Sequence, residues 1–429
     1  MLMAGLMFVL LFIAILLGFP VVIALGGIGA LWIVFSGNNH MAVVNSYYEG
    51  INNFVQMSVP FFILAGDLMC RARITNRLID FSKIIVGRVR SGLAYTTVLT
   101  SMFFAGLTGA GVSDVSALTP IFVPAMVKEG YKKDWACMLM ASSAIIGPTI
   151  PPSIIAVIYG AVTNTSIGGM LLACTVPGMI LGLTQMITIK VMRKKWGLPD
   201  DCQIVPMKDV PRITKNAVFA LLMPIIILGG ILSGQFTPTE AAAVAVVYAF
   251  VVGKAIYRSL SWQDVWNSMK ATVKTSAAMF LLMATGAILT WMMARTAVPV
   301  TLAHFLITIS SNPMFIFTVS MLLAMFLGLF MDNGVALILI APILAPIARQ
   351  VGLSDLQFGA AMIVALNIGL ITPPFGMCLF AAASVGRAKF ENVVKYVWPM
   401  LLCSIVVLVI MMLFPDFTLC LPRMGGYLK

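Results

Sequence analysis

The sequence predicts an all-α polytopic membrane protein built from an inverted repeat, and three observations lead to this fold class. Hydrophobic residues make up 61% of the 429 and charged residues only 10%, and apolar stretches long enough to cross a bilayer recur along the chain. A pattern of glycines and prolines in residues 106–177 returns 222 positions later. The basic residues gather in alternate loops.

The repeated pattern consists of eight glycines and prolines in register. Gly106, Pro120, Pro124, Gly130, Gly147, Pro151, Pro152 and Pro177 correspond to Gly328, Pro342, Pro346, Gly352, Gly369, Pro373, Pro374 and Pro399. Every proline of the second window has a counterpart in the first, whereas independent placement would give about 0.4 matches. A duplicated hydrophobic unit with its helix breakers in register is typical of secondary transporters.

Hydropathy and the positions of helix-breaking residues predict nine membrane crossings, near 3–36, 54–72, 134–163, 167–192, 214–234, 238–258, 276–295, 356–385 and 390–415. Two further stretches, 92–127 and 314–348, are apolar but interrupted in the middle. Each half would form roughly 24 Å of helix, which is shorter than the roughly 30 Å hydrocarbon core. We therefore expect two re-entrant helical hairpins.

If the N-terminus lies on the inner side, nine crossings place most of the basic residues in loops on that same side of the membrane. All 27 Lys and Arg then lie on the inner side except Arg295, Arg349, Arg423 and Lys429, which agrees with the positive-inside rule. The first unit starts outside and the second starts inside, so the duplication is inverted. Two inverted halves can exchange their roles at the two membrane faces, which supports alternating access.

The order of these elements divides the chain into five regions. They are an N-terminal span with an outer segment (1–53), repeat 1 (54–195), an inner linker with two connecting spans (196–275), repeat 2 (276–415) and an outer tail (416–429). Repeat 1 holds the hairpin 92–127 and a broken helix over 134–163; repeat 2 holds the hairpin 314–348 and a broken helix over 356–385. Residues 71–91 alternate apolar and basic residues and are expected to lie on the inner surface as an interfacial arm.

The hairpin tips and the broken helices are the candidate binding segments. The tips read GLTGAGVSDVSALTP (106–120) and GLFMDNGVALILIAP (328–342), and the broken helices carry GPTIPPS (147–153) and GLITPPFG (369–376). A Pro-Pro pair removes two backbone donors and frees carbonyls in the preceding turn. In lipid, such carbonyls are tolerated only where they are buried in protein or line a cavity.

Sodium takes carbonyl, hydroxyl and carboxylate oxygens, so we expect one sodium site per repeat, where a tip meets a break. The expected ligands are Ser113, Asp114, Gly147 and Thr149 in the first site and Asp332, Asn333, Gly369 and Thr372 in the second. An anionic substrate would be drawn to helix N-termini and backbone amides at the tips. The expected substrate region comprises Gly109, Gly111, Pro151, Pro152, Gly334, Pro373 and Pro374.

Two interpretations of the intramembrane acids stay open. Asp114 and Asp332 are among the few acids at membrane depth, where ionisable groups mark transport pathways. Each could instead cap the N-terminus of a half-helix, and a cap can also lie beside an ion. Elsewhere, structural roles are expected: an i,i+4 ion pair between Asp67 and Arg71, and a capping box that starts at Thr237.

Several functions are excluded by composition and missing motifs. The net charge of +12 reports membrane orientation and does not indicate nucleic-acid binding. The seven cysteines are scattered without a CxxC pair, so no disulfide framework or cysteine metal site is expected. The chain contains no GxxxxGK[ST], HExxH or GxSxG string, so it is not expected to be an enzyme and needs no organic cofactor.

At these motifs the chain resembles the large membrane subunit of tripartite ATP-independent periplasmic (TRAP) transporters, the DctM-like family. The matching stretches are GAGVSDVSALTPIFVPAMVKEGY (109–131), SSAIIGPTIPPSIIAVIYG (142–160), FLGLFMDNGVALILIAPILAPIARQVG (326–352) and NIGLITPPFGMCLFAAASV (367–385). The resemblance covers nearly the whole chain.

The resemblance implies a sodium-coupled elevator transporter in the bacterial inner membrane, with a cytoplasmic N-terminus and a periplasmic C-terminus. A mobile domain built from both hairpins and both broken helices would carry an organic acid past a scaffold. Family members work with a small four-helix membrane subunit (DctQ-like) and a periplasmic substrate-binding protein (DctP-like). Because residue 1 begins directly in the first span, the small subunit is expected to be a separate polypeptide.

Two alternatives remain: a self-sufficient sodium/organic-anion symporter of the same superfamily, and a channel. The sequence does not identify the substrate; sialic acid, C4-dicarboxylates and other carboxylates are candidates.

Overall fold

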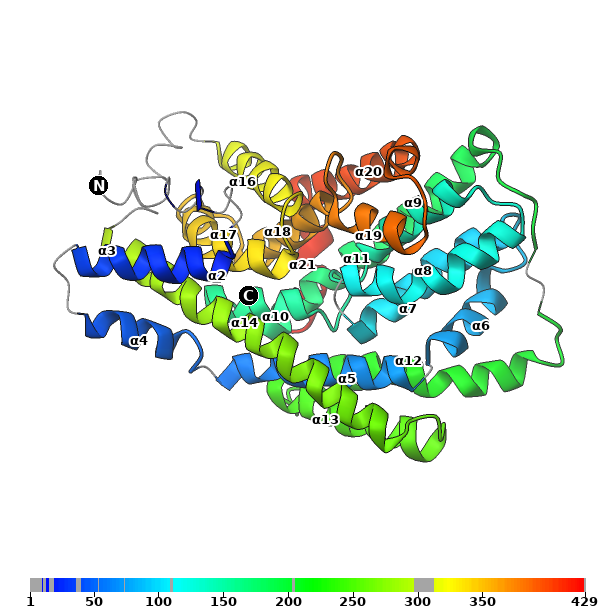
Figure 1. The fold of residues 1–429 in the computed structure, drawn as a ribbon, viewed down its shortest axis with the longest axis horizontal. Coiled ribbons are helices and arrows are strands. Elements are labelled where there is room, and N and C mark those ends of the chain that lie inside the picture. The colour runs from blue at the N-terminus through cyan, green and yellow to red at the C-terminus, as the bar shows by residue number, and fades with distance from the viewer. Residues whose placement is uncertain are drawn as a thin grey trace.

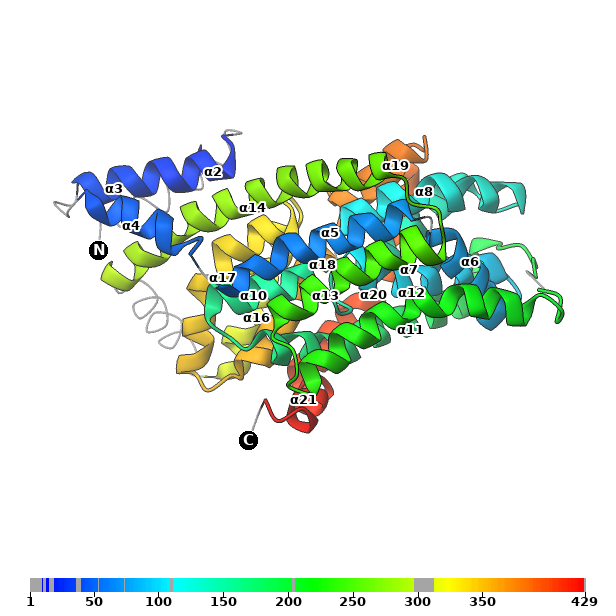
Figure 2. The same ribbon diagram turned by 90° about the horizontal axis from the view of Figure 1, so that it is seen from below.

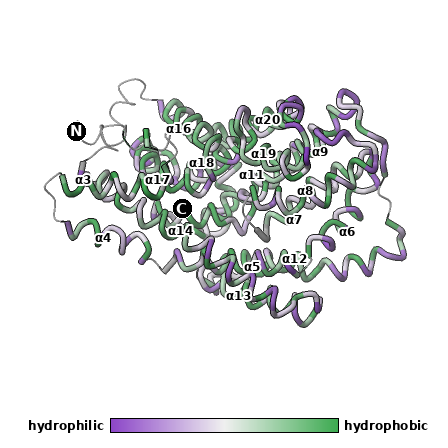
Figure 3. The backbone as a smooth tube through the Cα atoms, viewed as in Figure 1, coloured by the Kyte–Doolittle hydropathy of each residue, from purple (hydrophilic) through white to green (hydrophobic). Residues whose placement is uncertain are grey.

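The computed structural model describes residues 10, 13–14, 19–35, 40–52, 54–72, 74–108, 111–202, 205–296 and 312–427. Throughout these ranges the regular structure is helical, and no strand occurs, as the sequence predicts. Hydrophilic residues gather around the connections that follow α8, α11 and α13, while the helices themselves are mainly hydrophobic (Figure 3).

The helices form two groups, and most helices pack mainly against members of their own group (Figure 1). The first group, here called the flanking bundle, contains ten elements: α2 (Val21–Ile23), η1 (Ala24–Ile28), α3 (Gly29–Phe35), α4 (Met41–Glu49), η2 (Phe54–Met57), α5 (Ser58–Arg71), α12 (Val210–Leu232), α13 (Pro238–Val251), η3 (Val252–Ile256) and α14 (Trp262–Thr296).

The second group, here called the central bundle, contains both predicted hairpins and both predicted broken helices. Its members are α7 (Gly92–Thr108), α8 (Gly111–Lys128), α9 (Lys133–Ala144), α10 (Ile154–Thr163), α11 (Ile167–Trp196), α16 (Pro313–Gly328), α17 (Asn333–Gln350), α18 (Asp355–Gly369), α19 (Met377–Val385), α20 (Phe390–Leu413) and α21 (Pro415–Met424). Helix α6 (Ile74–Val86) contacts α7 of the central bundle and α12 of the flanking bundle.

The prolines account for the two interrupted helices. Helix α9 ends at Ala144 and α10 begins at Ile154; α18 ends at Gly369 and α19 begins at Met377. Each gap contains a Pro-Pro pair, whose missing N–H groups prevent the helical hydrogen bonds from continuing. Helix α10 restarts at a capping residue, because the hydroxyl of Ser153 accepts a hydrogen bond from the amide of Ala156 at 3.2 Å.

Helix α14 differs from the predicted boundaries. It runs unbroken from Trp262 to Thr296, so the predicted start of repeat 2 at residue 276 falls inside a helix. The first half of this helix contains no glycine or proline that would interrupt it. Its N-terminus is capped reciprocally: the amide of Asp264 donates to the Ser261 hydroxyl at 3.0 Å, and the Ser261 amide donates to the Asp264 carboxylate at 3.0 Å.

Six helices in the described ranges are long and apolar enough to cross a membrane: Ile167–Trp196, Val210–Ile231, Pro238–Ile256, Trp262–Ile288, Asn333–Gln350 and Phe390–Leu413. One of them is α17, the second half of the second predicted hairpin, and it has 18 residues. The argument that both halves are too short to span therefore does not hold for α17. Re-entry of either hairpin stays a prediction.

Two local predictions are confirmed. Arg71 donates to the carboxylate of Asp67 at 2.7 Å, one turn earlier on α5. Thr237 and Glu240 form the complete capping box at the start of α13. Two helices were not expected, α4 in the outer segment and α21 in the tail, and α21 packs against α11. The repeat register pairs the interfacial arm with residues 296–313, most of which lie outside the described residues.

Candidate functional site

A cavity of about 620 Å³ lies where the two bundles meet. One wall comes from the central bundle: the starts of α8, α10 and α17, together with Pro148 and Leu370 from the two breaks. The opposite wall is α14, which contacts α17 and runs along much of the length of the molecule (Figure 2). Segments more than 200 residues apart in the chain thus share one space.

The predicted ligands of the first site are only partly brought together. The Asp114 carboxylate is buried, with its residue 1% exposed, and a Cβ placed on Gly147 would collide with its Oδ2. Thr149 is fully buried, and its hydroxyl donates to the carbonyl of Ile145 at 3.3 Å. Ser113 is exposed and lines the cavity, because consecutive helical residues point about 100° apart.

In the second predicted site, two of the expected ligands form hydrogen bonds within their own segment of the chain. Asp332 caps α17, since its Oδ1 accepts a hydrogen bond from the amide of Gly334 at 2.9 Å. It also lines the cavity, so the capping role is confirmed and a ligand role stays a prediction. Thr372 turns back and donates to the carbonyl of Ile368 at 2.7 Å.

Gly369 serves close helix packing. A Cβ on Gly369 would lie 2.7 Å from the Cα of Gly328 and 2.6 Å from the carbonyl oxygen of Met325. These contacts bring α16 and α18 together, an approach that only a residue without a side chain permits.

A chain of buried side chains joins the two predicted repeats. The Nδ2 of Asn333, at the start of α17, donates to the Oδ1 of Asn367 on α18. The Nδ2 of Asn367 donates to the hydroxyl of Thr149 in the first break at 2.8 Å. Asn333 is 3% exposed, lines the cavity, and has no hydrogen-bond partner for its Oδ1.

Asn367 was not among the predicted site residues. The repeat alignment pairs it with Ile145, so the duplication offers no signal at this position. The available signal was the amide of Asn367 in the apolar stretch that follows Gln357 in α18, since intramembrane amides commonly join helices by hydrogen bonds.

Of the predicted substrate region, Gly111 alone is among the described residues that line the cavity, and the substrate role of the region stays a prediction. Gly111 lines the cavity and Gly334 is buried near Ile155; Gly109 lies outside the described residues. Pro151, Pro152, Pro373 and Pro374 are not among the residues that line this cavity. Pro148 and Leu370, which lie a few residues before the two Pro-Pro pairs, line it instead.

The carbonyls before the first Pro-Pro pair are partly used by the chain itself. The carbonyl oxygen of Pro148 accepts a hydrogen bond from the Ser153 hydroxyl, and that of Ile145 accepts one from Thr149. Fewer carbonyls are therefore available to an ion than the sequence suggests. The unsatisfied Oδ1 of Asn333 and the carboxylate of Asp114 are the donor atoms of this region that suit a hard cation best.

Two cavity residues on α14 were also missed as site residues. Lys274 and Thr275 line the wall opposite the tips, whereas the sequence placed Lys274 among the basic residues that report orientation. A second cavity, of about 470 Å³, continues from the first between α5, α8 and α14, and both share Ser113, Ile154 and Thr275.

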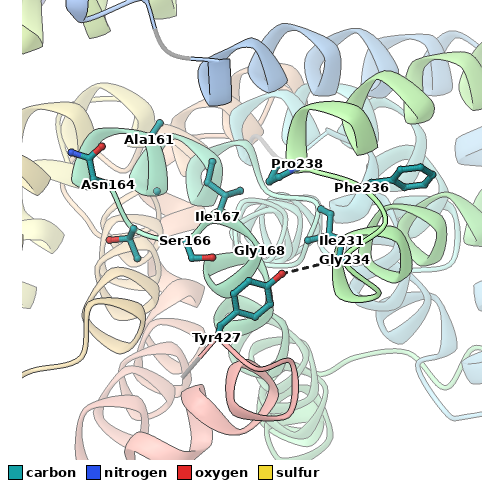
Figure 4. Close-up of a pocket in the computed structure, with 12 residues that line it drawn as sticks. Ala161, Asn164, Ser166, Ile167, Gly168, Ile231, Gly234, Phe236, Pro238 and Tyr427 are labelled. Carbon is teal, nitrogen blue, oxygen red and sulfur yellow. Dashed lines mark hydrogen bonds between the residues drawn. The ribbon is translucent and has the colours of Figure 1, made fainter. Parts of the chain in front are cut away.

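A third cavity, of about 450 Å³, lies away from the tips, between the α10–α11 turn, the α12–α13 turn and the C-terminal segment (Figure 4). Tyr427 reaches into it, and its hydroxyl donates to the carbonyl of Ile231 at 3.5 Å. Asn164 and Ser166 supply further polar side chains. None of the predicted site residues lines this space.

Comparisons with known proteins agree on one family. The model of the family described as tripartite ATP-independent periplasmic transporter, DctM component, matches residues 8–417. The sialic acid TRAP transporter large permease protein SiaM of Vibrio cholerae is 39% identical over 378 residues, which cover 87% of this chain and 88% of that protein. The C4-dicarboxylate TRAP transporter large permease protein DctM of Pseudomonas aeruginosa is 33% identical, with 94% of each chain covered.

The fold is also similar to a solved transporter structure. The Alcanivorax borkumensis YdaH transporter superposes with a TM-score of 0.59 at 14% sequence identity, over 87% of this chain and 88% of that one.

Proposed function

The chain belongs to the DctM family of tripartite ATP-independent periplasmic transporters, as a large permease subunit, and we propose that it imports an organic acid with sodium by an elevator mechanism. The observation that carries the proposal is the cavity between the bundles. It joins the tips and breaks of both repeats on one wall to a helix of the flanking bundle on the other.

The division into two bundles supports an elevator motion. The central bundle holds every predicted ion ligand, and the chain of Asn333, Asn367 and Thr149 ties its two repeats together. Contacts between the bundles are fewer and involve mainly α5, α6 and α14. A body that is tied internally and packed loosely against its neighbour is suited to move as a unit.

Sodium coupling is proposed on the character of the donor atoms. The buried carboxylate of Asp114 and the unsatisfied Oδ1 of Asn333 lie near the break that contains Thr149. A buried acceptor without a partner is costly, and a bound cation would satisfy it. These residues would hold the ion, and an ion there would supply positive charge beside the substrate.

The binding of an organic acid is supported by the helix starts that line the cavity. Helices α8, α10 and α17 all present their N-termini there, and the free amides and the dipole of a helix N-terminus favour anions. The SiaM and DctM relatives carry sialic acid and C4-dicarboxylate in their names, so these two classes of acid are the first to test.

We propose the same assembly that the family name describes. A separate small four-helix membrane subunit would complete the permease, a periplasmic binding protein would deliver the acid, and the complex would lie in the bacterial inner membrane. The N-terminus would then face the cytoplasm and the C-terminus the periplasm.

The test is reconstitution in proteoliposomes with the small subunit and the binding protein, using labelled N-acetylneuraminate and succinate as probes. We expect uptake under an inward sodium gradient only when all three components are present, and no uptake under an equal potassium gradient. Uptake by the chain alone would favour a self-sufficient symporter. Flux that neither saturates nor follows the sodium gradient would indicate a channel.

A further inference from the structure

Lys274 is the one basic side chain among the described residues that line the cavity between the bundles. It lies on α14, three turns after the helix begins at Trp262, and its side chain is exposed. No ion pair of Lys274 occurs among the described residues. Its charge is therefore available to a molecule in the cavity.

The neighbouring basic residue on the same helix behaves differently. Lys270 lies one turn earlier, and its Nζ lies over the ring of Trp266, 5.4 Å from the ring centre. Lys270 does not line the cavity. Both lysines suit the positive-inside pattern, but only Lys274 is placed where a substrate would lie.

The charges around the cavity favour an anion opposite Lys274. The starts of α8, α10 and α17 face the same space, and each contributes partial positive charge. The acid on the wall, Asp332, already accepts the amide of Gly334 at its helix cap. The buried Oδ1 of Asn333, which has no partner, adds an acceptor for a hydroxyl or ammonium group of the same ligand.

The two walls belong to different bundles. The helix starts are part of the central bundle, whereas Lys274 is part of the flanking bundle. A carboxylate held between them contacts both, and a displacement of the central bundle carries the helix starts away from Lys274. The ammonium group can then reach the cargo in only one of the two transport states.

We propose that Lys274 is a state-dependent contact for the substrate carboxylate, which raises affinity for the organic acid in the arrangement seen here and releases it when the bundles shift. This inference rests on the proposed elevator function. It assigns part of the substrate specificity to the flanking bundle, and it predicts that the substrate affinities at the two membrane faces depend on Lys274 unequally.

The experiment uses the complete transporter in right-side-out and inside-out membrane vesicles, with succinate and N-acetylneuraminate as probes. The half-saturating concentration for exchange is measured at each face for the unmodified chain, Lys274→Gln, Lys274→Arg and the matched control Lys270→Gln. We expect Lys274→Gln to raise this concentration about tenfold at one face, the loss typical of one charge-assisted hydrogen bond, and less than about twofold at the other face. Lys274→Arg should retain most of the affinity, and Lys270→Gln should change neither face.

Three results would decide against the inference. Equal shifts at both faces would mean that Lys274 contacts the substrate in both states, and no shift at either face would mean that it contacts none. A shift of the same size in Lys270→Gln would indicate a general effect of surface charge. Sodium-driven uptake by the unmodified transporter is measured before any variant. Its absence would refute the proposed function and not the role of Lys274.

Discussion

The buried chain of Asn333, Asn367 and Thr149 leads to a prediction that can be tested without knowing the substrate. Asn367 makes two hydrogen bonds within the central bundle, one to each repeat. Replacement of Asn367 by Ala removes both bonds and leaves the Asn333 amide group without an acceptor. Each lost bond is worth about 1 kcal/mol, and a buried unsatisfied donor costs about 1–3 kcal/mol. We therefore expect Asn367→Ala to lower the free energy of unfolding by about 2–4 kcal/mol.

The specific claim is that Asn333 and Asn367 act as a pair. Asn333→Ala removes one bond and leaves the Oδ1 of Asn367 unsatisfied, so it should cost about 1–3 kcal/mol. The double variant lacks both amide groups, so no amide remains without its partner. The total cost should therefore be less than the sum of the two single costs. Coupling between buried polar pairs in membrane proteins averages about 0.6 kcal/mol and reaches about 1.7 kcal/mol. We expect a value of about 1 kcal/mol here.

The assay is reversible unfolding of the purified chain by SDS in mixed micelles, followed by loss of helical circular dichroism, for all four members of the cycle. The matched control is Asn392→Ala, whose Oδ1 accepts a hydrogen bond from Lys395 at 3.0 Å at the exposed surface, and it should change stability by less than about 0.5 kcal/mol. Costs that add within about 0.3 kcal/mol would refute the pairing. A loss in Asn392→Ala as large as that in Asn367→Ala would refute the claim that the buried position matters.

Three further predictions concern single residues. Asp332→Ala should weaken the sodium dependence of uptake and also fray α17, whereas Asp332→Ser keeps a capping oxygen; a normal sodium dependence in the Ser variant would remove Asp332 from the ligands. Gly369→Ala should lower thermal stability by about 1–3 kcal/mol, because its Cβ would overlap the backbone of Gly328, while Gly229→Ala, which meets nothing within 4 Å, should raise it by about 0.5–1 kcal/mol; equal effects would refute the packing argument. Burial, and then the hydrogen bond to Asp201, raise the pKa of Tyr131 above its ordinary value of 10.0, so the stability that it contributes is complete below pH 10.0 and is lost as the pH rises through the raised pKa. The alkaline loss of stability should be smaller in Tyr131→Phe, and identical profiles would contradict this.

Much of the central bundle follows from local chemistry. The prolines at 151–152 and 373–374 end their helices wherever the rest of the chain lies, because a missing N–H and a ring clash act on the preceding turn. The capping box at Thr237 and the ion pair between Asp67 and Arg71 likewise depend on residues within four positions. Such features are legible from the sequence because the interacting groups are neighbours along the chain.

The candidate site was predicted less completely. The repeat alignment selected the tips and the breaks, and the cavity is lined by both, but the alignment has no information about residues that break the symmetry. By the repeat register, Asn367 corresponds to Ile145, which has no amide group, and Lys274 corresponds to Asn52, which carries no charge. The expected boundary of repeat 2 at residue 276 falls inside α14, because residues 262–275 are mostly polar in sequence although they are helical.

The class of protein and the positions of the helix breaks follow from the sequence alone, since each depends on hydrophobicity, proline and glycine within a short window. Only the tertiary structure decided that Asn367 bonds Thr149 across 218 positions, that Gly369 packs on Gly328, and that Lys274 faces the helix starts of the central bundle. Contacts between distant segments depend on how helices cross and rotate about their axes. A rotation of one residue, about 100°, moves a side chain from a cavity to a lipid-facing surface, and no local pattern specifies that rotation.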